Sequence, residues 1–517
     1  MNILVSTMGK HLEVGVRLIE AFKTEIDIGT IGFLVANSKF FKEFNKKNTF
    51  IRDNNVELIK EWEYTKINDA TTPNYERIRS YEEKLAIPSF WHAIMADRRL
   101  FFGKYCKSKQ HYAPRFSEEQ MLKILEQALC QIDVFFKTKK PDIILSFGTS
   151  ILGDYLIYLF AKYYNVPYLQ IKATKVKNFI SLHDTPIGIS SHIIKSYNRN
   201  DFSERSKKEA ISYINLVRSR GLQYEGAILS SRSRLFGRLK KAPLTLIKGL
   251  YGTIQIFKDS VIRNDCHLHD RFIPSLYHSL LNPLNSYYIE QRLLRNKKFL
   301  TMDNLGTVDE FIFFPLHFEP EVSIQIFGRP YQNQIELIRN LALSAPVGTK
   351  IVVKEHPRSI GFRPYSYYRK LLDIPNVYLI DPFIKAFKIV PHAKMVAVIT
   401  GSIGLEAVII GCPVLTFGEV AYNLLPDTMV GKVEALKYLG EKIRSLLENY
   451  EYNHGALIRY LSALIETSAP VDMYSILLNK KNRFNDNHGE LSKEERRNQG
   501  YQNLSDFCLG EIKRCCH

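Results

Sequence analysis

The sequence has no stretch that approaches the ~20 consecutive apolar residues that a membrane-spanning helix needs. Its first residues, MNILVSTMGK, begin directly with a strand-like run and lack the basic start and long apolar core of a secretory signal. Its seven cysteines include no CxxC pair and no regular spacing, which is typical of thiols in a reducing compartment. We therefore expect a cytoplasmic protein.

Several motifs of nucleotide-dependent enzymes are also absent. Neither GxxxxGK[ST] nor GxGxxG occurs, which disfavours P-loop kinases and ordinary dinucleotide oxidoreductases. There is no Asp-x-Asp pair, the usual metal-bridging motif of the other large glycosyltransferase class. The stretch DCHLHD at 265–270 looks like metal ligands, but no second ligand cluster lies nearby, and we expect no metal site.

The sequence does have a large excess of positive charge. Its 71 Lys and Arg against 53 Asp and Glu give a formal net charge of +18. This excess implies an anionic partner, which could be nucleic acid, a sugar nucleotide or an acidic membrane surface. Clustered bases between 205 and 304 fit a membrane-surface contact or the solvated face of packed helices. These bases include Arg232, Arg234, Arg238, Lys240, Lys241 and Lys248.

Strand-like and helix-like segments alternate in two regions of the chain, which predicts two parallel sheets covered by helices. We therefore predict an α/β protein with two Rossmann-like, doubly wound domains that face a cleft. The predicted units are an N-terminal, acceptor-side domain (1–204), a basic helical connector or insertion (205–304), a C-terminal nucleotide-sugar-binding domain (305–480) and a polar, mobile tail (481–517).

Polar residues follow three apolar strands of the second domain, where ligands of open parallel sheets bind. His317 and Glu321 follow the first strand and could form a proton-transfer pair, or Glu321 could cap a short helix. Lys354, His356 and Pro357 follow the second strand, and we expect Lys354 and His356 to face a nucleotide phosphate. The proline restrains the backbone, so that His356 can donate to a phosphate; an isolated histidine in such a place is more commonly a loop or capping residue.

The third strand end, TGSIGLE at 400–406, has the pattern of a turn that opens a helix. Because a helix N-terminus attracts anions, Thr400, Gly401, Ser402 and Gly404 are predicted to bind a phosphate. Glu406, about one turn further, could accept hydrogen bonds from ribose hydroxyls. The two glycines could instead serve only a tight turn and close packing, but two other polar loops at the same sheet edge favour phosphate binding.

The stretches PLHFEPE, VVKEHPR and TGSIGLEAVIIGCPVLTFG, in this order, resemble the capsule polysaccharide synthesis proteins of bacteria, whose characterised members include Kdo transferases that use CMP-Kdo. FWHAIMADR at 90–98 is similar to the same family. The resemblance covers about 80–185 and 305–425, and it implies the GT-B architecture with the donor nucleotide on the C-terminal domain. It assigns the donor phosphate to His356, Pro357 and Ser402.

The resemblance implies a metal-independent glycosyltransferase of capsular polysaccharide biosynthesis, with no cofactor besides a nucleotide-sugar donor. Kdo from CMP-Kdo is the transfer it suggests, to a lipid-linked or growing glycan at the inner membrane face. The expected partners are this donor, a glycan or glycolipid acceptor and an anionic membrane surface, without nucleic acid. A carboxylate from the opposite domain is also needed in a retaining route, and Asp184 is preferred over Asp154 for it.

Two other classes remain open. A nucleotide-sugar epimerase of the same architecture would also have a His-Pro loop and a Ser/Gly-Glu helix start, with more acidic loops for proton transfer. A non-enzymatic polyanion-binding protein would explain the charge, but polar residues at three separate strand ends argue against a cleft without chemistry.

Overall fold

The computed structural model describes most of the chain, including both regions of alternating strands and helices. The six bases named above and the 265–270 stretch lie outside the described residues. These residues are 1–64, 72–97, 99–101, 114, 116–148, 151–222, 247, 250, 251, 254, 284–319, 321, 323–357, 359–473, 477 and 493–516.

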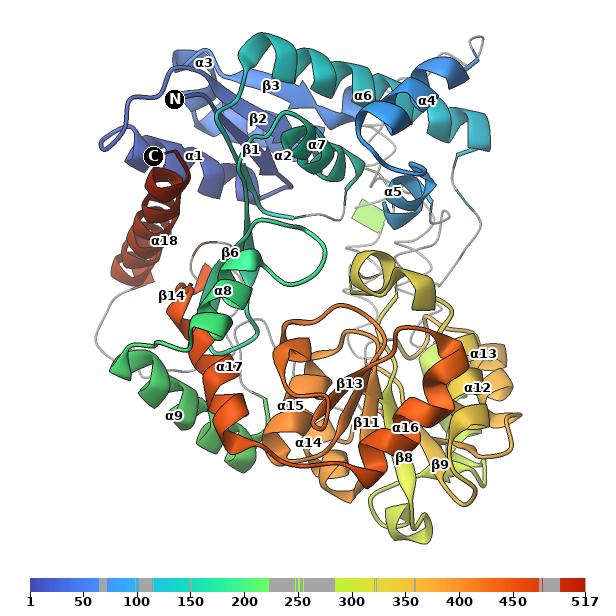
Figure 1. Cartoon of the computed structure of the whole chain (residues 1–517). Helices are drawn as coiled ribbons and strands as arrows, with labels where there is room; N and C mark the ends of the chain where they lie inside the picture. The colour runs from blue at the N-terminus through green and yellow to red at the C-terminus, as the bar shows by residue number, and fades with distance from the viewer. Residues whose placement is uncertain are drawn as a thin grey trace.

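The N-terminal sheet has the strand order β14-β6-β5-β4-β1-β2-β3 (Figure 1). The five strands β1 to β5 are parallel to one another. Strand β6 is antiparallel to β5, and β14 is antiparallel to β6. The strands are β1 (Ile3–Thr7), β2 (Ile31–Val35), β3 (Glu57–Lys60), β4 (Ile143–Ser146), β5 (Tyr168–Ala173), β6 (Phe179–His183) and β14 (Ser468–Pro470).

Helices cover both faces of this sheet. Side chains alternate along a strand, so Leu4 packs in one buried cluster with helices α6 and α7, while Ile3 and Val5 pack in another with α1 and α18. The helices of this part are α1 (His11–Phe22), α2 (Ser38–Lys47), α3 (Phe50–Asp53), α4 (Tyr75–Lys84), α5 (Trp91–Ala96), α6 (Glu118–Lys139), α7 (Leu152–Tyr163), α8 (Ser191–Arg199) and α9 (Glu204–Arg220).

The C-terminal sheet is parallel throughout, with the order β13-β12-β11-β8-β9-β10-β7. Its strands are β7 (Phe299–Leu300), β8 (Phe311–Pro315), β9 (Lys350–Lys354), β10 (Val377–Ile380), β11 (Met395–Val398), β12 (Val414–Thr416) and β13 (Val430–Lys432). Its helices are α12 (Gln334–Ser344), α13 (Tyr365–Leu372), α14 (Ala386–Ile389), α15 (Ser402–Ile410) and α16 (Leu439–Glu448).

Both sheets contain the six-strand order 3-2-1-4-5-6 of the Rossmann fold. In the N-terminal sheet this order is β3-β2-β1-β4-β5-β6, and in the C-terminal sheet it is β10-β9-β8-β11-β12-β13. In such a sheet the strand order reverses between the first and fourth strands, and ligands bind beside this point. In the C-terminal sheet these strands are β8 and β11. The predicted α/β class with two doubly wound, Rossmann-like domains is therefore confirmed.

The end of the chain returns to the N-terminal domain. Helix α17 (His454–Glu466) packs on α8 and α9, β14 joins the N-terminal sheet, and α18 (Lys493–Cys516) packs on α1 (Figure 1). In α18, Leu504, Cys508 and Ile512 are buried. The prediction of a mobile tail is therefore wrong for 493–516, because a sparse apolar stripe at helical spacing lies within a polar sequence.

No described helix combines the length and apolarity that a membrane crossing requires.

Candidate active-site pocket between the two domains

A pocket of about 130 Å³ lies between the two domains. The N-terminal domain lines it with residues at the end of β5 and on β6, and the C-terminal domain lines it with the start of α15 and the chain after β12. Both sheets thus contribute the carboxyl-end region of a strand, as expected for α/β domains. The polar lining residues include Lys172, Thr174, Lys175, Ser181, His183, Ser323, Thr400, Ser402, Glu419 and Tyr422.

The first turn of α15 faces the pocket. Gly401 is the N-cap residue and has no side chain to cap the helix, while Ser402 is the first helical residue. The first N–H groups of a helix have no partners within it and carry a partial positive charge. Thr400, Gly401 and Ser402 therefore form the part of the predicted phosphate site that the structure brings to the pocket.

Gly404 serves the packing of this turn. A Cβ at this position would lie only 2.4 Å from the hydroxyl oxygen of Tyr422. That hydroxyl donates to the main-chain oxygen of Gly401 at 2.7 Å. Gly404 thus admits the tyrosine that holds the turn, which is the alternative noted from the sequence for this glycine.

His317 contacts the same turn through Thr400. It follows β8 at the point where the strand order reverses, and its Nε2 accepts a 3.4 Å hydrogen bond from the main-chain N–H of Thr400. Burial, together with the charges of Lys175 and Arg363, lowers the pKa of His317 to about 3, so the ring is neutral at pH 7. The Oγ1 of Thr400 in turn donates to the main-chain oxygen of Ser323 at 2.8 Å.

Glu321 has different neighbours from His317. Its side chain is exposed, and its main-chain oxygen accepts from the N–H groups of Ile324 and Gln325, both at 3.1 Å. Its carboxyl group is partly withdrawn from water, which raises the pKa of Glu321, and the charge of Lys175 and a hydrogen bond with Ser323 oppose this rise. Among the described contacts, His317 and Glu321 do not form the predicted proton-transfer pair.

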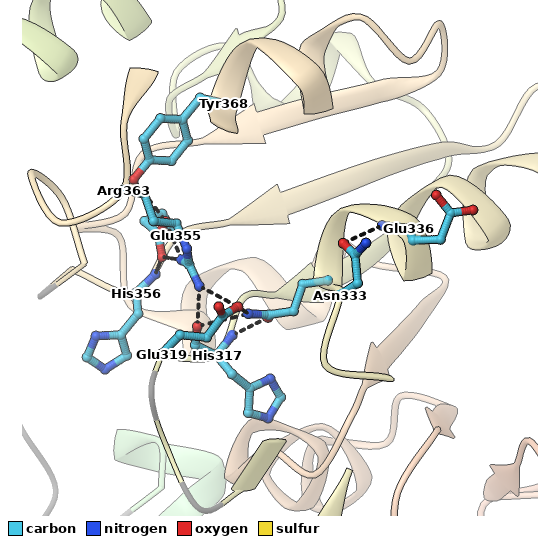
Figure 2. A network of polar contacts seen from close by, with 9 residues as sticks. His317, Glu319, Asn333, Glu336, Glu355, His356, Arg363 and Tyr368 are labelled. Carbon is cyan, nitrogen blue, oxygen red and sulfur yellow. Dashed lines mark hydrogen bonds and ion pairs between the residues drawn. The ribbon is translucent and has the colours of Figure 1, made fainter. Parts of the chain in front are cut away.

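Glu355 occupies the centre of a buried network at the end of β9 (Figure 2). Its Oε2 accepts from Arg363 at 2.6 Å and from the Tyr368 hydroxyl at 2.9 Å, and its Oε1 accepts from the N–H of His356 at 2.6 Å. Arg363 also donates to the main-chain oxygen of His317 at 2.7 Å. The network therefore fixes the two histidine loops to each other.

The ring of His356 makes an edge-to-face contact with Phe318, with 5.9 Å between the ring centroids. Figure 2 shows the rings of His317 and His356 on the same side of the network, pointing away from it. Neither His356 nor Pro357 is among the pocket-lining residues. Their predicted contact with the nucleotide remains a prediction.

Lys354 and Glu406 are engaged away from the pocket. The Nζ of Lys354 donates to the main-chain oxygen of Pro382 at 2.8 Å, and burial lowers the pKa of Lys354 to about 8. Glu406 accepts a 2.7 Å hydrogen bond from the N–H of Leu222, just after α9, and burial raises the pKa of Glu406. The structure thus corrects the prediction that these two side chains face the nucleotide: neighbouring segments cover them.

Asp184 caps a helix. Its Oδ1 accepts from the Ser190 hydroxyl at 3.1 Å and from the N–H of Ser191, the first residue of α8, at 3.0 Å. Burial opposes its ionisation, but these hydrogen bonds outweigh burial and lower the pKa of Asp184. The carboxylate is therefore occupied, and the preceding residue, His183, lines the pocket in its place.

Asp154, the second candidate, is buried outside the pocket lining. The Ser146 hydroxyl donates to its Oδ1 at 2.8 Å, and burial raises the pKa of Asp154 to about 7. The FWHAIMADR segment has a structural role nearby. Its Asp97 pairs with Arg99 and accepts from the N–H of Leu152 at 2.9 Å, which caps α7.

The sequence-based selection missed Lys172, Lys175 and His183. A signal was present, because the two lysines follow the apolar run at 166–171, and polar residues after such a run obey the same strand-end rule. Ser181 and His183 are two residues apart on β6 and face the same side. Among the described residues there is no group of three or more His, Cys, Asp or Glu side chains that could hold a metal ion.

Comparison with known proteins relates part of the chain to a protein family. Residues 253–432 match the model of the capsule polysaccharide biosynthesis protein family. A comparison with curated proteins finds no match.

Several solved structures are distantly similar. The beta Kdo 2,7 transferase of KpsC from Thermosulfurimonas dismutans has 14% identity and a TM-score of 0.35, over 76% of this chain and 97% of that one. The beta Kdo 2,4 transferase of KpsC has 14% identity and a TM-score of 0.32, over 71% and 94%. UDP-GlcNAc 2-epimerase from Neisseria meningitidis has 14% identity and a TM-score of 0.24, over 90% and 98%.

TM-scores this low give no basis for transferring an activity to this chain. The family match covers the connector end and most of the C-terminal domain, including all three polar strand ends. Residues 253–432 therefore match the model of the capsule polysaccharide biosynthesis protein family, the family that the motifs of the sequence resemble.

Proposed function

We propose that the chain is a glycosyltransferase of capsular polysaccharide biosynthesis that takes a sugar from a nucleotide donor. CMP-Kdo is the donor to test first, and a lipid-linked or growing glycan is the acceptor. The observation that carries the proposal is the first turn of α15, which opens into a pocket between two Rossmann-like domains. The family match over 253–432 supports the same assignment.

In this proposal the donor phosphate binds at Gly401 and Ser402. When the glycosidic bond to the phosphate breaks, negative charge grows on the leaving nucleotide. Fixed N–H donors at a helix N-terminus stabilise such charge without rearrangement. Thr400 and His317 hold the turn in place, so the donors are preorganised.

Positive charge in the pocket comes from the start of α15 on one wall and from Lys172 and Lys175 on the opposite wall. We accordingly propose that transfer is independent of a metal ion. Of the three predicted catalytic residues, Asp184 caps α8 and His317 supports Thr400, which leaves Glu321 for proton transfer. Its side chain lies beside Ser323 and the pocket-lining Lys175, and in this proposal it approaches an acceptor hydroxyl when the domains close.

A charge substitution in α15 tests the phosphate site. Ser402→Asp places a negative charge at the helix start, where it suits the helix dipole but repels a phosphate. We expect the wild-type protein to gain thermal stability with CMP or CMP-Kdo, and Ser402→Asp to lose this gain while keeping its own melting temperature. Ser402→Asn, which is neutral, is the matched control and should lose less than about threefold in affinity.

The nucleotide set decides between functions. Stabilisation by UDP and UDP-GlcNAc but not by CMP would contradict the CMP donor, and interconversion of UDP-sugar epimers without an acceptor would identify an epimerase. A protein that no nucleotide stabilises, or a Ser402→Asp variant with unchanged nucleotide affinity, would refute the proposed phosphate site.

A further inference from the structure

The wall of the pocket opposite α15 is built from the N-terminal domain. Lys172 lies at the end of β5, Lys175 follows in the next turn, and Ser181 and His183 lie on β6. The phosphate site on α15 uses none of these residues. Their arrangement therefore requires an explanation of its own.

His183 has an unused polar atom in this wall. Its side chain is only 6% exposed, its Nε2 is hydrogen bonded to the Ser181 hydroxyl at 3.0 Å, and its Nδ1 has no hydrogen-bond partner within the described part of the chain. Burial and the neighbouring charge of Lys172 keep the ring neutral, with a pKa of about 3. When the serine donates to Nε2, the Nδ1 carries the proton and can donate to a ligand. A buried polar atom that lacks a partner is costly, so a bound acceptor would stabilise it.

Lys172 and Lys175 add positive charge to the same wall. Lys172 is half-buried, and its Nζ lies 4.2 Å from the centroid of the Phe327 ring in the opposite domain. Within the described part of the chain, neither lysine forms an ion pair with a carboxylate at up to 4.0 Å. Burial, with the like charge of Lys175, lowers the pKa of Lys172 to about 8.

Nearby carboxylates do not neutralise this wall. Glu419 lines the pocket but pairs with Lys432 at 2.6 Å. Asp184 is occupied by its hydrogen bonds to the start of α8. Glu321 offsets part of the charge of Lys175, but it is not among the charges that act on Lys172. The wall thus has an excess of donors and positive charge in a space that a small anionic group can enter.

We propose that Lys172, Lys175 and His183 form a second anion subsite, which binds an oxyanion of the sugar or acceptor while α15 holds the donor phosphate. This inference rests on the proposed function and deepens it: the ligand that fills the pocket carries two anionic groups, one for each wall. A carboxylate on the donor sugar, or a carboxylate or phosphate on the acceptor, has this chemistry. Lys172 then determines specificity for acidic over neutral substrates.

Paired nucleotide ligands test the subsite in the full-length chain by calorimetry. CMP-N-acetylneuraminate carries a carboxylate that CMP lacks, and UDP-glucuronate carries one that UDP-glucose lacks. For the nucleotide type that binds, we expect the acidic ligand to bind the wild type more tightly, and Lys172→Met to weaken it at least about tenfold. Binding of the ligand without the carboxylate should change less than about twofold.

Lys177→Met is the matched control. It removes one positive charge from the same segment, but Lys177 pairs with Glu209 at 2.8 Å and does not line the pocket. Lys172→Arg keeps the charge and should restore most of the affinity. The melting temperature of Lys172→Met without ligand should equal or exceed that of the wild type, because a half-buried ammonium with a lowered pKa is lost. A purely structural lysine would instead lower it.

A second arm identifies the source of the anion. Free N-acetylneuraminate and inorganic phosphate are titrated into protein saturated with CMP. If either free anion binds and Lys172→Met weakens this binding, the anionic group belongs to the acceptor. If Lys172→Met weakens only the binding of the CMP-sugar, the anionic group belongs to the donor. Equal effects of Lys172→Met and Lys177→Met on every ligand would overturn the subsite while the nucleotide response of Ser402→Asp still stood. Lys172-dependent binding of free anions without any nucleotide binding would support the subsite and refute the proposed function.

Discussion

The Glu355 network of the C-terminal domain and the pocket wall of the N-terminal domain treat their charges in opposite ways. In the C-terminal domain, the Glu355 carboxylate accepts hydrogen bonds from Arg363 and Tyr368, and the network holds His317 and His356 in place (Figure 2). In the N-terminal wall, Lys172 and His183 have donors to spare. Paired charges stabilise a shape, whereas unpaired donors beside a pocket require a ligand. Glu355, one of the charges in VVKEHPR, therefore stabilises the structure of the loop.

Breaking the paired side of this comparison has the largest expected effect. Arg363→Met leaves the Glu355 carboxylate buried without its cation and should lower the free energy of unfolding by about 3–5 kcal/mol. Urea denaturation measures this change. The matched control is Arg339→Met, which removes an arginine from an exposed pair with Glu336 and should cost less than about 1 kcal/mol. Similar losses in both variants would contradict the structural role of the network.

The unpaired side should respond to pH. The pKa of Lys172 is lowered to about 8 by burial, so its ammonium is mostly present at pH 7 and mostly absent at pH 9. Because an anion binds the charged form, affinity for a carboxylate-bearing ligand should fall by up to about tenfold over this interval. The neighbouring titratable groups are Lys175, His183, Asp184, His192 and Glu321.

Lys172→Arg separates the contribution of Lys172 from theirs, because arginine keeps its charge throughout this range. Calorimetry at pH 7 and 9 should show a much smaller decline for this variant. An equal decline in the wild type and in Lys172→Arg would assign the pH dependence to another group.

The smallest expected effect concerns Asp184. As a helix cap, it should tolerate Asp184→Asn with little loss of stability or transfer activity, whereas Asp184→Ala should cost about 1 kcal/mol in the free energy of unfolding. Loss of activity by orders of magnitude in a stable Asp184→Asn protein would restore its catalytic assignment. The lowered pKa of Asp184 also means that its contribution to stability is present above its unfolded pKa and is lost as acid protonates it.

The local pattern of apolar and polar residues was sufficient to predict the strands and helices of both sheets. Apolar runs such as 311–314 and 395–399 correspond to β8 and β11, and the TGSIGLE turn opens α15 as predicted. The return of the chain to the N-terminal domain could not be predicted in this way. The apolar stripe of α18 is short of hydrophobic residues, and only its contact with α1 explains the burial of Leu504 and Ile512.

The site shows the same division. Strand-end polarity placed Thr400, Gly401 and Ser402 correctly at the pocket, because a helix start after a parallel strand lies at the ligand-binding edge of its sheet. It could not decide where longer side chains go. Lys354 and Glu355 sit at the end of β9 and Glu406 lies in α15, yet each turns to a partner from another segment.

The sequence by itself determined the α/β class, the two Rossmann-like regions, the family resemblance of 253–432 and the turn that opens α15, because these depend on periodicity and on motifs within a few residues. Tertiary structure alone decided which charges are paired. Arg363 reaches Glu355 and His317 only after β8 and β9 lie side by side, and Lys172 meets Phe327 only across the domain interface. Pairing depends on distances between segments that are far apart in the chain. The same distances therefore decide which charges stabilise the fold and which remain unpaired at the pocket.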